Sequence, residues 1–182
     1  MITMKNELMI DIETTGTNPG CKVLTLGAFG FAKDGSQVEF YKRFSVLKLV
    51  EEGFQDDVAT MDWWRKKDKD AFDEAFGGKD DPKEGLAEFK QWCYANFAMG
   101  AKDGFKVWCK GIDFDFPILK FFLAHFGHHF PWKFWDQYDY RTISKLFPVI
   151  TASENNGMAH SAIEDAKAQM RGLRAFYALV KD

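Results

Sequence analysis

The chain has few of the features that define several common protein classes. Its 182 residues include only three cysteines, Cys21, Cys93 and Cys109, an odd number spread over apolar segments. We therefore expect buried free thiols rather than a disulfide framework or a cysteine-based zinc site. No internal repeat, low-complexity segment or apolar stretch of bilayer-spanning length is present, and Lys5 and Glu7 interrupt the apolar residues at the N-terminus. These absences predict a cytoplasmic protein with no membrane partner.

The chain also has no excess of basic residues. Lysine and arginine total 24 against 27 for aspartate and glutamate, a formal charge of −3. A protein that holds nucleic acid by phosphate contacts alone is usually basic, but bound divalent cations can reverse the sign of the charge locally. A hydrophobic content of 46% predicts a packed core, and we expect one domain over residues 1–182.

Three predicted strands come first, over residues 7–13, 23–33 and 37–46, with an Asp34-Gly35 hairpin turn between the last two. Helices and strands then alternate, so the pattern predicts an α/β fold with a mixed central sheet flanked by helices. The later elements are a short helix over 60–72, a helix from Pro82 capped by Asp81 and Glu84, a strand over 105–109, a helix over 118–126, a strand over 132–135 and a final helix from Ala162.

An Asp-x-Glu pair follows the first apolar run. Asp11 and Glu13 lie two residues apart on the first predicted strand, so their side chains should project to the same face. Thr14-Thr15-Gly16 then forms a predicted turn that opens this end of the strand to solvent. Together the two carboxylates could bind one cation.

A second acidic cluster lies near the C-terminus. Ser161 and Glu164 have capping-box spacing, so the last helix should begin at Ala162, with His160 just outside it and Asp165 on its first turn. A helix N-terminus favours a nearby carboxylate or phosphate. The same pattern also fits an ordinary cap with a solvated aspartate.

A third acidic segment lies where the strand over 105–109 leads into a helix. Pro117 is tolerated only in the first turn, so Asp115 lies at the helix entrance and Asp113 on the preceding loop. Sequence geometry does not separate these two aspartates as candidates for a site. Asp115 also fits a simple N-cap.

The three acidic segments resemble the three motifs of the DnaQ-like, DEDDh-type 3′-to-5′ exonucleases, whose fold is ribonuclease H-like. Bacteriophage members are especially similar, and the resemblance covers most of the chain. It implies that Asp11, Glu13, Asp115, His160 and Asp165 form the site, and it selects Asp115 over Asp113. The segments that support it beyond the acidic residues are 108–111, 114–119, 133–135 and 141–142. Relatives often have a polar pair such as His-Asn where this chain has Lys110-Gly111.

The resemblance also implies a cofactor and a role for each residue. Two divalent cations about 3.5 to 4 Å apart can activate water and stabilise the leaving oxygen in phosphodiester hydrolysis. Hard Mg²⁺ or Mn²⁺ prefers carboxylate oxygens to cysteine sulfur. We expect Asp11 to bridge both ions, Glu13 and Asp165 to complete the ion on the nucleophile side, Asp115 to hold the other ion, and His160 to take the proton of the attacking water.

Substrate contacts are expected from Thr14, Trp64 and Phe114. Trp63 and Trp64 could stack terminal bases, although helix packing is the alternative for at least one of them. The basic run beside them, which either follows a phosphate backbone or keeps a helix face solvated, comprises Arg65, Lys66, Lys67 and Lys69.

Other polar residues receive structural predictions. Three histidines surround Gly127 at a helix end without an acidic residue nearby in sequence, so we expect no metal ligand among them. Asp139, with Arg141 and Thr142, is expected to organise the approach to the last helix without a catalytic part. The histidines are His125, His128 and His129.

The sequence thus predicts a metal-dependent exonuclease that releases nucleoside 5′-monophosphates from the 3′ end of single-stranded nucleic acid. DNA is the expected substrate because of the bacteriophage likeness, and the host cytoplasm is the expected location if the chain is phage-encoded. Oligoribonuclease-like trimming of RNA is the first alternative. The others are a nucleic-acid-binding module without catalysis and a metal-dependent phosphatase that acts on free nucleotides.

Overall fold

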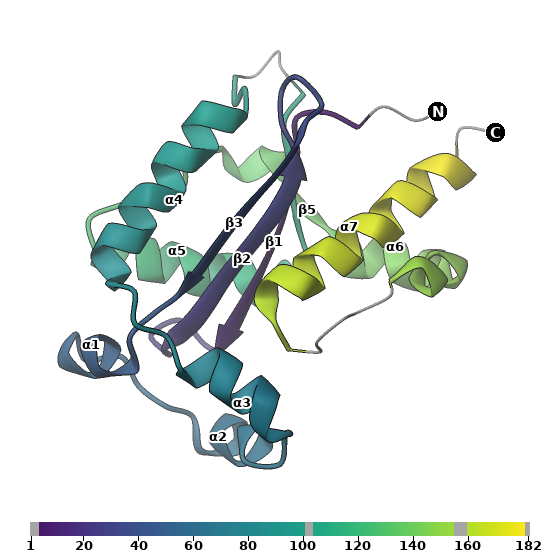
Figure 1. Cartoon of the computed structure of the whole chain (residues 1–182). Helices are drawn as coiled ribbons and strands as arrows, with labels where there is room; N and C mark the ends of the chain where they lie inside the picture. The colour runs from purple at the N-terminus through teal and green to yellow at the C-terminus, as the bar shows by residue number, and fades with distance from the viewer. Residues whose placement is uncertain (1–3, 101–103, 155–159, 181–182) are drawn as a thin grey trace.

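A five-stranded mixed sheet forms the centre of the computed structural model (Figure 1). The structure describes residues 4–100, 104–154 and 160–180. The strand order is β3-β2-β1-β4-β5; β1, β2 and β3 pair antiparallel, while β4 is parallel to β1 and β5 to β4. The strands are β1 (Glu7–Thr14), β2 (Val23–Phe31), β3 (Gln37–Arg43), β4 (Lys106–Cys109) and β5 (Gln137–Asp139).

Helices cover both faces of the sheet. Helices α4 and α5 lie on one face and α6 and α7 on the other, while α2 and α3 form an arm beyond the C-terminal end of β1 (Figure 1). No helix within the described ranges is long and apolar enough to cross a membrane. The helices are α1 (Val46–Glu51), α2 (Val58–Trp64), α3 (Lys69–Phe76), α4 (Pro82–Asn96), α5 (Asp115–His125), α6 (Tyr140–Leu146) and α7 (Ala162–Leu179), with 3-10 helices at Phe134–Asp136 and Pro148–Ser153.

Strand β1 separates two hydrophobic clusters. Leu8 and Ile10 are fully buried in the larger cluster with residues of α4 and α5, whereas Met9 is fully buried in the cluster with residues of α7. Since strand side chains alternate, Asp11 and Glu13 share the face of Met9, the face that α7 covers. Burial of each such apolar side chain stabilises the fold by about 1.5 to 3 kcal/mol. The core therefore fixes the direction in which the two acids point.

Gly27 allows α7 to begin directly over the sheet. It pairs with Asp11 in the β1–β2 register. A Cβ atom at Gly27 would lie 2.3 Å from the backbone of Ala162 and Ile163, so only glycine permits this approach. The first turn of α7 is thereby brought next to the acids of β1.

Much of the predicted element order is observed. Helix α7 begins at Ala162, and the Asp81 side chain caps α4 by accepting a hydrogen bond from the Glu84 backbone N–H. The strands predicted to reach residues 33 and 46 end earlier, at Phe31 and Arg43. The three cysteines are free and buried, as predicted.

The single helix predicted over 60–72 is wrong. The segment forms two helices, α2 and α3, because Asp68 interrupts the helical pattern and its side chain accepts a hydrogen bond from the Ala71 backbone N–H. Asp57 caps α2 in the same way through Thr60. Helix α1 was not predicted, and the strand predicted over 37–46 extended to its first residue, Val46.

The strand predicted over 132–135 is also wrong. Trp132 is buried, but Phe134 and Trp135 are both exposed, at 77% and 55%, so the aromatic run does not alternate between buried and exposed positions as a strand would. The chain forms a 3-10 turn there and then strand β5, which pairs with β4. The aromatic composition was mistaken for strand periodicity.

Candidate active site

Asp11 and Glu13 lie at the C-terminal half of β1, below the first turns of α7. The Asp11 carboxylate accepts a hydrogen bond of 2.8 Å from the Gln169 amide of α7. Gln169 is 4% exposed, so this contact fixes the Asp11 side chain within the protein. Glu13, at 9% exposure, is close to the end of the strand, where the backbone opens toward a cavity.

Asp115 joins these two acids from the start of α5. It is 3% exposed, whereas Asp113 on the preceding loop is exposed. The Asp115 carboxylate accepts hydrogen bonds from the Ile12 backbone N–H and the Cys109 thiol. Its charge acts on both Asp11 and Glu13. The structure thus brings Asp115, and not Asp113, to the acids of β1.

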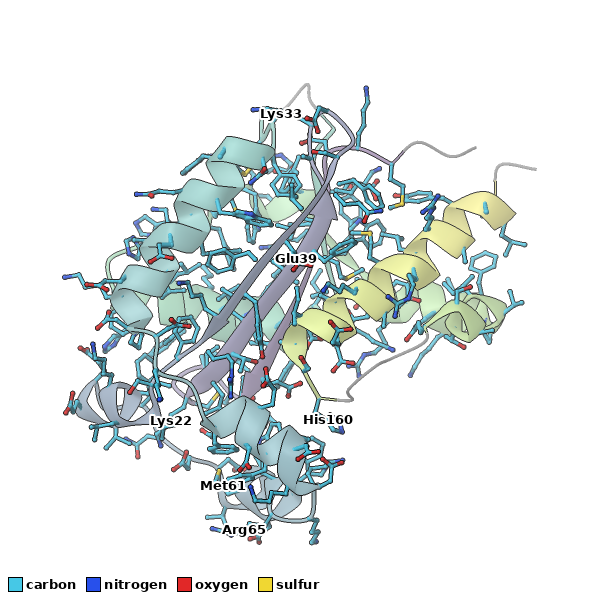
Figure 2. All side chains as sticks on the ribbon, viewed as in Figure 1. Lys22, Lys33, Glu39, Met61, Arg65 and His160 are labelled. Atoms are coloured by element: carbon cyan, nitrogen blue, oxygen red, sulfur yellow. The ribbon has the colours of Figure 1, made fainter. Side chains whose placement is uncertain are left out.

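Asp165 lies in the first turn of α7 and His160 lies two residues before the helix, and both are close to Glu13. Glu13, His160 and Asp165 offer ligand atoms that all lie within 4.8 Å of one another. His160 has a positive φ of 64°, and its backbone N–H donates to the Asp165 carboxylate. Figure 2 shows His160 just before α7, beside the arm formed by α2 and α3. The predicted capping box is not formed, because the Ser161 side chain makes no cap hydrogen bond.

Burial raises the pKa of all four carboxylates, and the neighbouring acids raise those of Asp11 and Glu13 further. Burial raises the pKa of Asp11 well above its ordinary value, and the charges of Asp115, Glu13 and Asp165 raise it further. Burial, followed by the charge of Asp165, raises the pKa of Glu13 to about 8. Burial also raises the pKa of Asp115 to about 7 and that of Asp165 above its usual range. So many desolvated carboxylates are costly unless a cation compensates them.

The donor set fits divalent metal ions. Four carboxylates provide only hard oxygen atoms, which suit Mg²⁺ or Mn²⁺, and one imidazole stands beside them. Asp11 and Asp115 lie outside the tight group of Glu13, His160 and Asp165 but act on it electrostatically. A single small ion would therefore not engage all five side chains at once.

A cavity of about 590 Å³ opens beside Glu13. The predicted substrate residues Thr14, Trp64 and Phe114 all line it. Trp64 is 1% exposed and donates its indole N–H to the Thr14 carbonyl oxygen at 2.8 Å, so it forms part of the supporting wall. Trp63 is 40% exposed and presents the accessible indole surface.

Asp139 and the three histidines near Gly127 lie outside the acidic cluster. His125 lies 2.8 Å from the Glu52 carboxylate, and His128 and His129 line a different cavity beside α5. None of the three belongs to the acidic cluster in the described chain. Asp139 caps α6, because its carboxylate accepts hydrogen bonds from the backbone N–H groups of Arg141 and Thr142.

Residues 6–177 match the family described as the Rv2179c-like 3′-5′ exoribonuclease domain. The chain belongs to this family. It is also 25% identical to the exodeoxyribonuclease of Enterobacteria phage T4 over 196 aligned positions, which cover 87% of this chain and 83% of the relative. These matches identify the chain as a DnaQ-like 3′-5′ exonuclease.

The fold of this exonuclease is similar to that of a solved nuclease. The crystal structure of cell-death related nuclease 4 (CRN-4) superposes with a TM-score of 0.56 at 15% identity. The alignment covers 95% of this chain but 64% of that chain, so this exonuclease spans less than two thirds of its structural neighbour. The mixed sheet and its flanking helices are consistent with the ribonuclease H-like fold.

Two contacts of the exonuclease site were not predicted. Gln169 lies one helical turn after Asp165, on the same face of α7, and this spacing was a usable signal. The Cys109 thiol contacts Asp115 from the end of β4. That contact had no signal in the sequence, because it depends on how β4 and α5 are joined.

Proposed function

We propose that this chain is a DEDDh-type exonuclease that removes nucleoside 5′-monophosphates from the 3′ end of single-stranded DNA with the help of two divalent cations. The observation that supports it is the convergence of Asp11, Glu13, Asp115 and Asp165 from β1, α5 and α7 next to His160. Acids from three distant parts of the chain thus lie close together in a desolvated site. Such an arrangement is expected of a metal-dependent site.

Each acid has a proposed place around the ions. Asp11, held by Gln169, would be a ligand of both ions, because it is the acid whose pKa responds to all three others. Glu13 and Asp165 would hold the ion next to His160, and Asp115 would hold the other. When bound, the two cations supply Lewis-acid stabilisation to the phosphate and the leaving 3′ oxygen.

His160 is the proposed general base. Burial and the charge of Lys67 lower the pKa of its imidazole, so the ring is neutral at physiological pH and has a lone pair that can accept a proton. Its ligand atom lies within 4.8 Å of those of Glu13 and Asp165. A water between these groups would lose its proton to the imidazole as it attacks phosphorus.

The cavity beside Glu13 is the proposed pocket for the terminal nucleoside. Its aromatic wall, with Phe114 and Trp64, and the Thr14 backbone can enclose a base and sugar without reading sequence. The volume of about 590 Å³ is in the range of small-molecule sites. We propose Thr14, Trp64 and Phe114 as its substrate contacts.

The substrate is either single-stranded DNA or single-stranded RNA. The T4 relative is named an exodeoxyribonuclease, which favours DNA. The family description names an exoribonuclease, which favours RNA. The two differ at the 2′-hydroxyl, which RNA has and DNA lacks and by which a protein can tell them apart.

One assay separates these possibilities. Matched single-stranded DNA and RNA are incubated with Mg²⁺, Mn²⁺ or EDTA, with wild-type protein and with Asp11→Ala, and the released species are identified by chromatography. We expect nucleoside 5′-monophosphates, faster release from DNA, and no release with EDTA or with the variant. Faster release from RNA would select the exoribonuclease, inorganic phosphate a phosphatase, and binding without release an inactive module. Activity that resists EDTA contradicts the metal mechanism.

A further inference from the structure

The basic run between α2 and α3 separates into cations with different surroundings. Arg65 and Lys69 each form a salt bridge with an aspartate three or four residues away, and Lys66 is exposed to solvent. Lys67 differs from all three. It is partly buried, and its Nζ lies 4.0 Å from the centre of the Trp63 ring, a cation–π contact.

This contact places Lys67 next to the catalytic cluster. The Trp63 ring lines the cavity together with Glu13, and it meets the His160 ring edge to face at 4.8 Å. Figure 2 shows His160 between the start of α7 and the arm formed by α2 and α3. Lys67, Trp63 and His160 therefore form a continuous series of contacts from the turn after α2 to the acids.

Other cations near the acids are already engaged. Lys110 forms a salt bridge of 2.8 Å with Glu154, and the Arg141 guanidinium donates to the Lys110 carbonyl oxygen at 2.6 Å. Within the described parts of the chain, Lys67 forms no salt bridge with a carboxylate. Its positive charge nevertheless reaches the cluster, since it lowers the pKa of Glu13. Lys67 is thus a cation that an incoming anion can engage without breaking an ion pair.

We propose that Lys67 contacts the scissile phosphodiester and is a further catalytic residue of this site. The inference rests on the exonuclease function proposed above. The Lys67 ammonium donates a hydrogen bond to a non-bridging oxygen of the phosphate that joins the terminal nucleoside to the strand. Trp63 holds the ammonium in place before the substrate binds. A cation–π contact at a partly exposed site is weaker than a charge-assisted hydrogen bond, so the transfer from ring to phosphate is favourable.

Negative charge on the phosphate oxygens is what this contact stabilises. During attack by water, charge is redistributed over the non-bridging oxygens and the leaving oxygen, and a fixed donor within a desolvated pocket lowers the barrier. No bond to Lys67 forms or breaks, and its proton stays on the ammonium. The rate of hydrolysis should therefore depend on the cation and not on its ability to titrate.

The first test compares two neighbouring lysines. Lys67→Met keeps the length of the side chain and its packing on Trp63 but removes the charge, and Lys66→Met is the matched control from the same turn. We expect Lys67→Met to lower kcat/KM on a single-stranded oligonucleotide by about tenfold or more, with an unchanged melting temperature. Lys67→Arg should recover most of the activity. Equal rates for the Lys67→Met and Lys66→Met proteins would overturn the proposal.

The second test identifies the phosphate and does not need turnover. Binding of a short fluorescein-labelled oligonucleotide is measured by anisotropy with Ca²⁺ in place of Mg²⁺, with a neutral methylphosphonate at either the terminal linkage or the next one. We expect wild-type protein to prefer the charged terminal linkage and Lys67→Met to reduce that preference about tenfold, with no such change at the next linkage. A preference that Lys67→Met leaves intact contradicts the inference. If wild-type protein binds in this way but releases no nucleotide, the proposed function fails while the contact stands.

Discussion

Asp113 and Asp115 show how much a two-residue difference in position matters for the chemistry of a carboxylate. Asp115 is buried against the other acids, whereas Asp113 is exposed on the loop. We predict that Asp115→Asn lowers kcat/KM on single-stranded substrate about 100-fold or more, and that Asp113→Asn changes it by less than about twofold. Steady-state kinetics on the two purified variants measure both effects. Similar losses in both would mean that the exposed loop, and not burial, determines function.

Gln169 offers a test of how Asp11 is held. Its amide donates to Asp11 at 2.8 Å, and its Oε1 atom is buried without a hydrogen-bond partner in the structure. Loss of an outer contact to a metal ligand typically weakens metal affinity or activity by about 10- to 100-fold. We therefore predict that Gln169→Leu raises the Mg²⁺ concentration for half-maximal activity about tenfold while the melting temperature changes little. Gln37→Leu, on the exposed side of β3, is the control and should leave the metal titration unchanged.

The residues of the site could be predicted from sequence to different degrees. Asp11 and Glu13 followed from the alternation of a strand, and this was enough to place them on one face. Which of Trp63 and Trp64 is accessible from the cavity could not be predicted. Adjacent helical residues point about 100° apart, and the sequence does not say which direction faces the cavity. The structure buries Trp64 and exposes Trp63. The contact of Trp63 with Lys67 has i,i+4 spacing, which was a usable signal.

At the scale of elements, periodicity predicted the long segments well and the short ones poorly. The 18 residues of α7 carry an extended apolar stripe, and its start at Ala162 was predicted. Helices α2 and α3 have only 7 and 8 residues, too few for a periodic signal to reveal the break between them. The cap at Asp68 was the available signal, and it was overlooked in favour of one longer helix. Strand β5, with 3 residues, exists because β4 offers it a partner.

Gly27 connects the element scale to the site. An added Cβ would lie 2.3 Å from the backbone at the start of α7, so Gly27→Ala must displace the helix that carries Asp165. We predict a loss of stability of about 1 to 3 kcal/mol and a loss of most activity, measured by thermal melting and by kinetics. Gly53→Ala is the control: its φ of +84° makes alanine strained, but nothing lies within 4 Å of the added atom. It should lower stability and leave kcat/KM unchanged; a comparable loss of kcat/KM in Gly53→Ala would show that destabilisation alone explains the effect.

At the scale of the whole molecule, the sheet topology explains why residues 158 positions apart, Asp11 and Gln169, meet. Strands β1 and β4 run parallel, so their C-terminal ends open at the same edge of the sheet, where α5 then begins. The approach of α7 over Gly27 completes the site from the opposite face. Sequence alone predicted the mixed sheet, but the order β3-β2-β1-β4-β5 required the pairing of β4 with β1 to be known. The expectation of one domain over residues 1–182 stays a prediction.

The buried acids make the stability of the metal-free protein depend on pH. The pKa of Glu13 is about 8 in the folded chain and 4.5 ordinarily, and burial raises the pKa of Asp115 to about 7. Between about pH 4.5 and pH 8 the folded chain retains protons on these carboxyl groups that the unfolded chain has lost. The buried acids therefore cost no stability below about pH 4.5, and the free energy of unfolding falls as the pH rises toward 8. One retained proton corresponds to a drop in melting temperature of about 3 to 5 °C per pH unit.

Metal binding should oppose this loss, because cations bind the deprotonated carboxylates of the folded state. We predict that the melting temperature in EDTA falls from about pH 5 to about pH 8, and that Mg²⁺ raises it more at the higher pH. Differential scanning fluorimetry at matched ionic strength measures both effects. Asp113→Asn should show the same dependence as wild type, since Asp113 is exposed, whereas Asp11→Asn should flatten it. A melting temperature in EDTA that rises with pH over this range would mean that the acids do not form a common desolvated cluster.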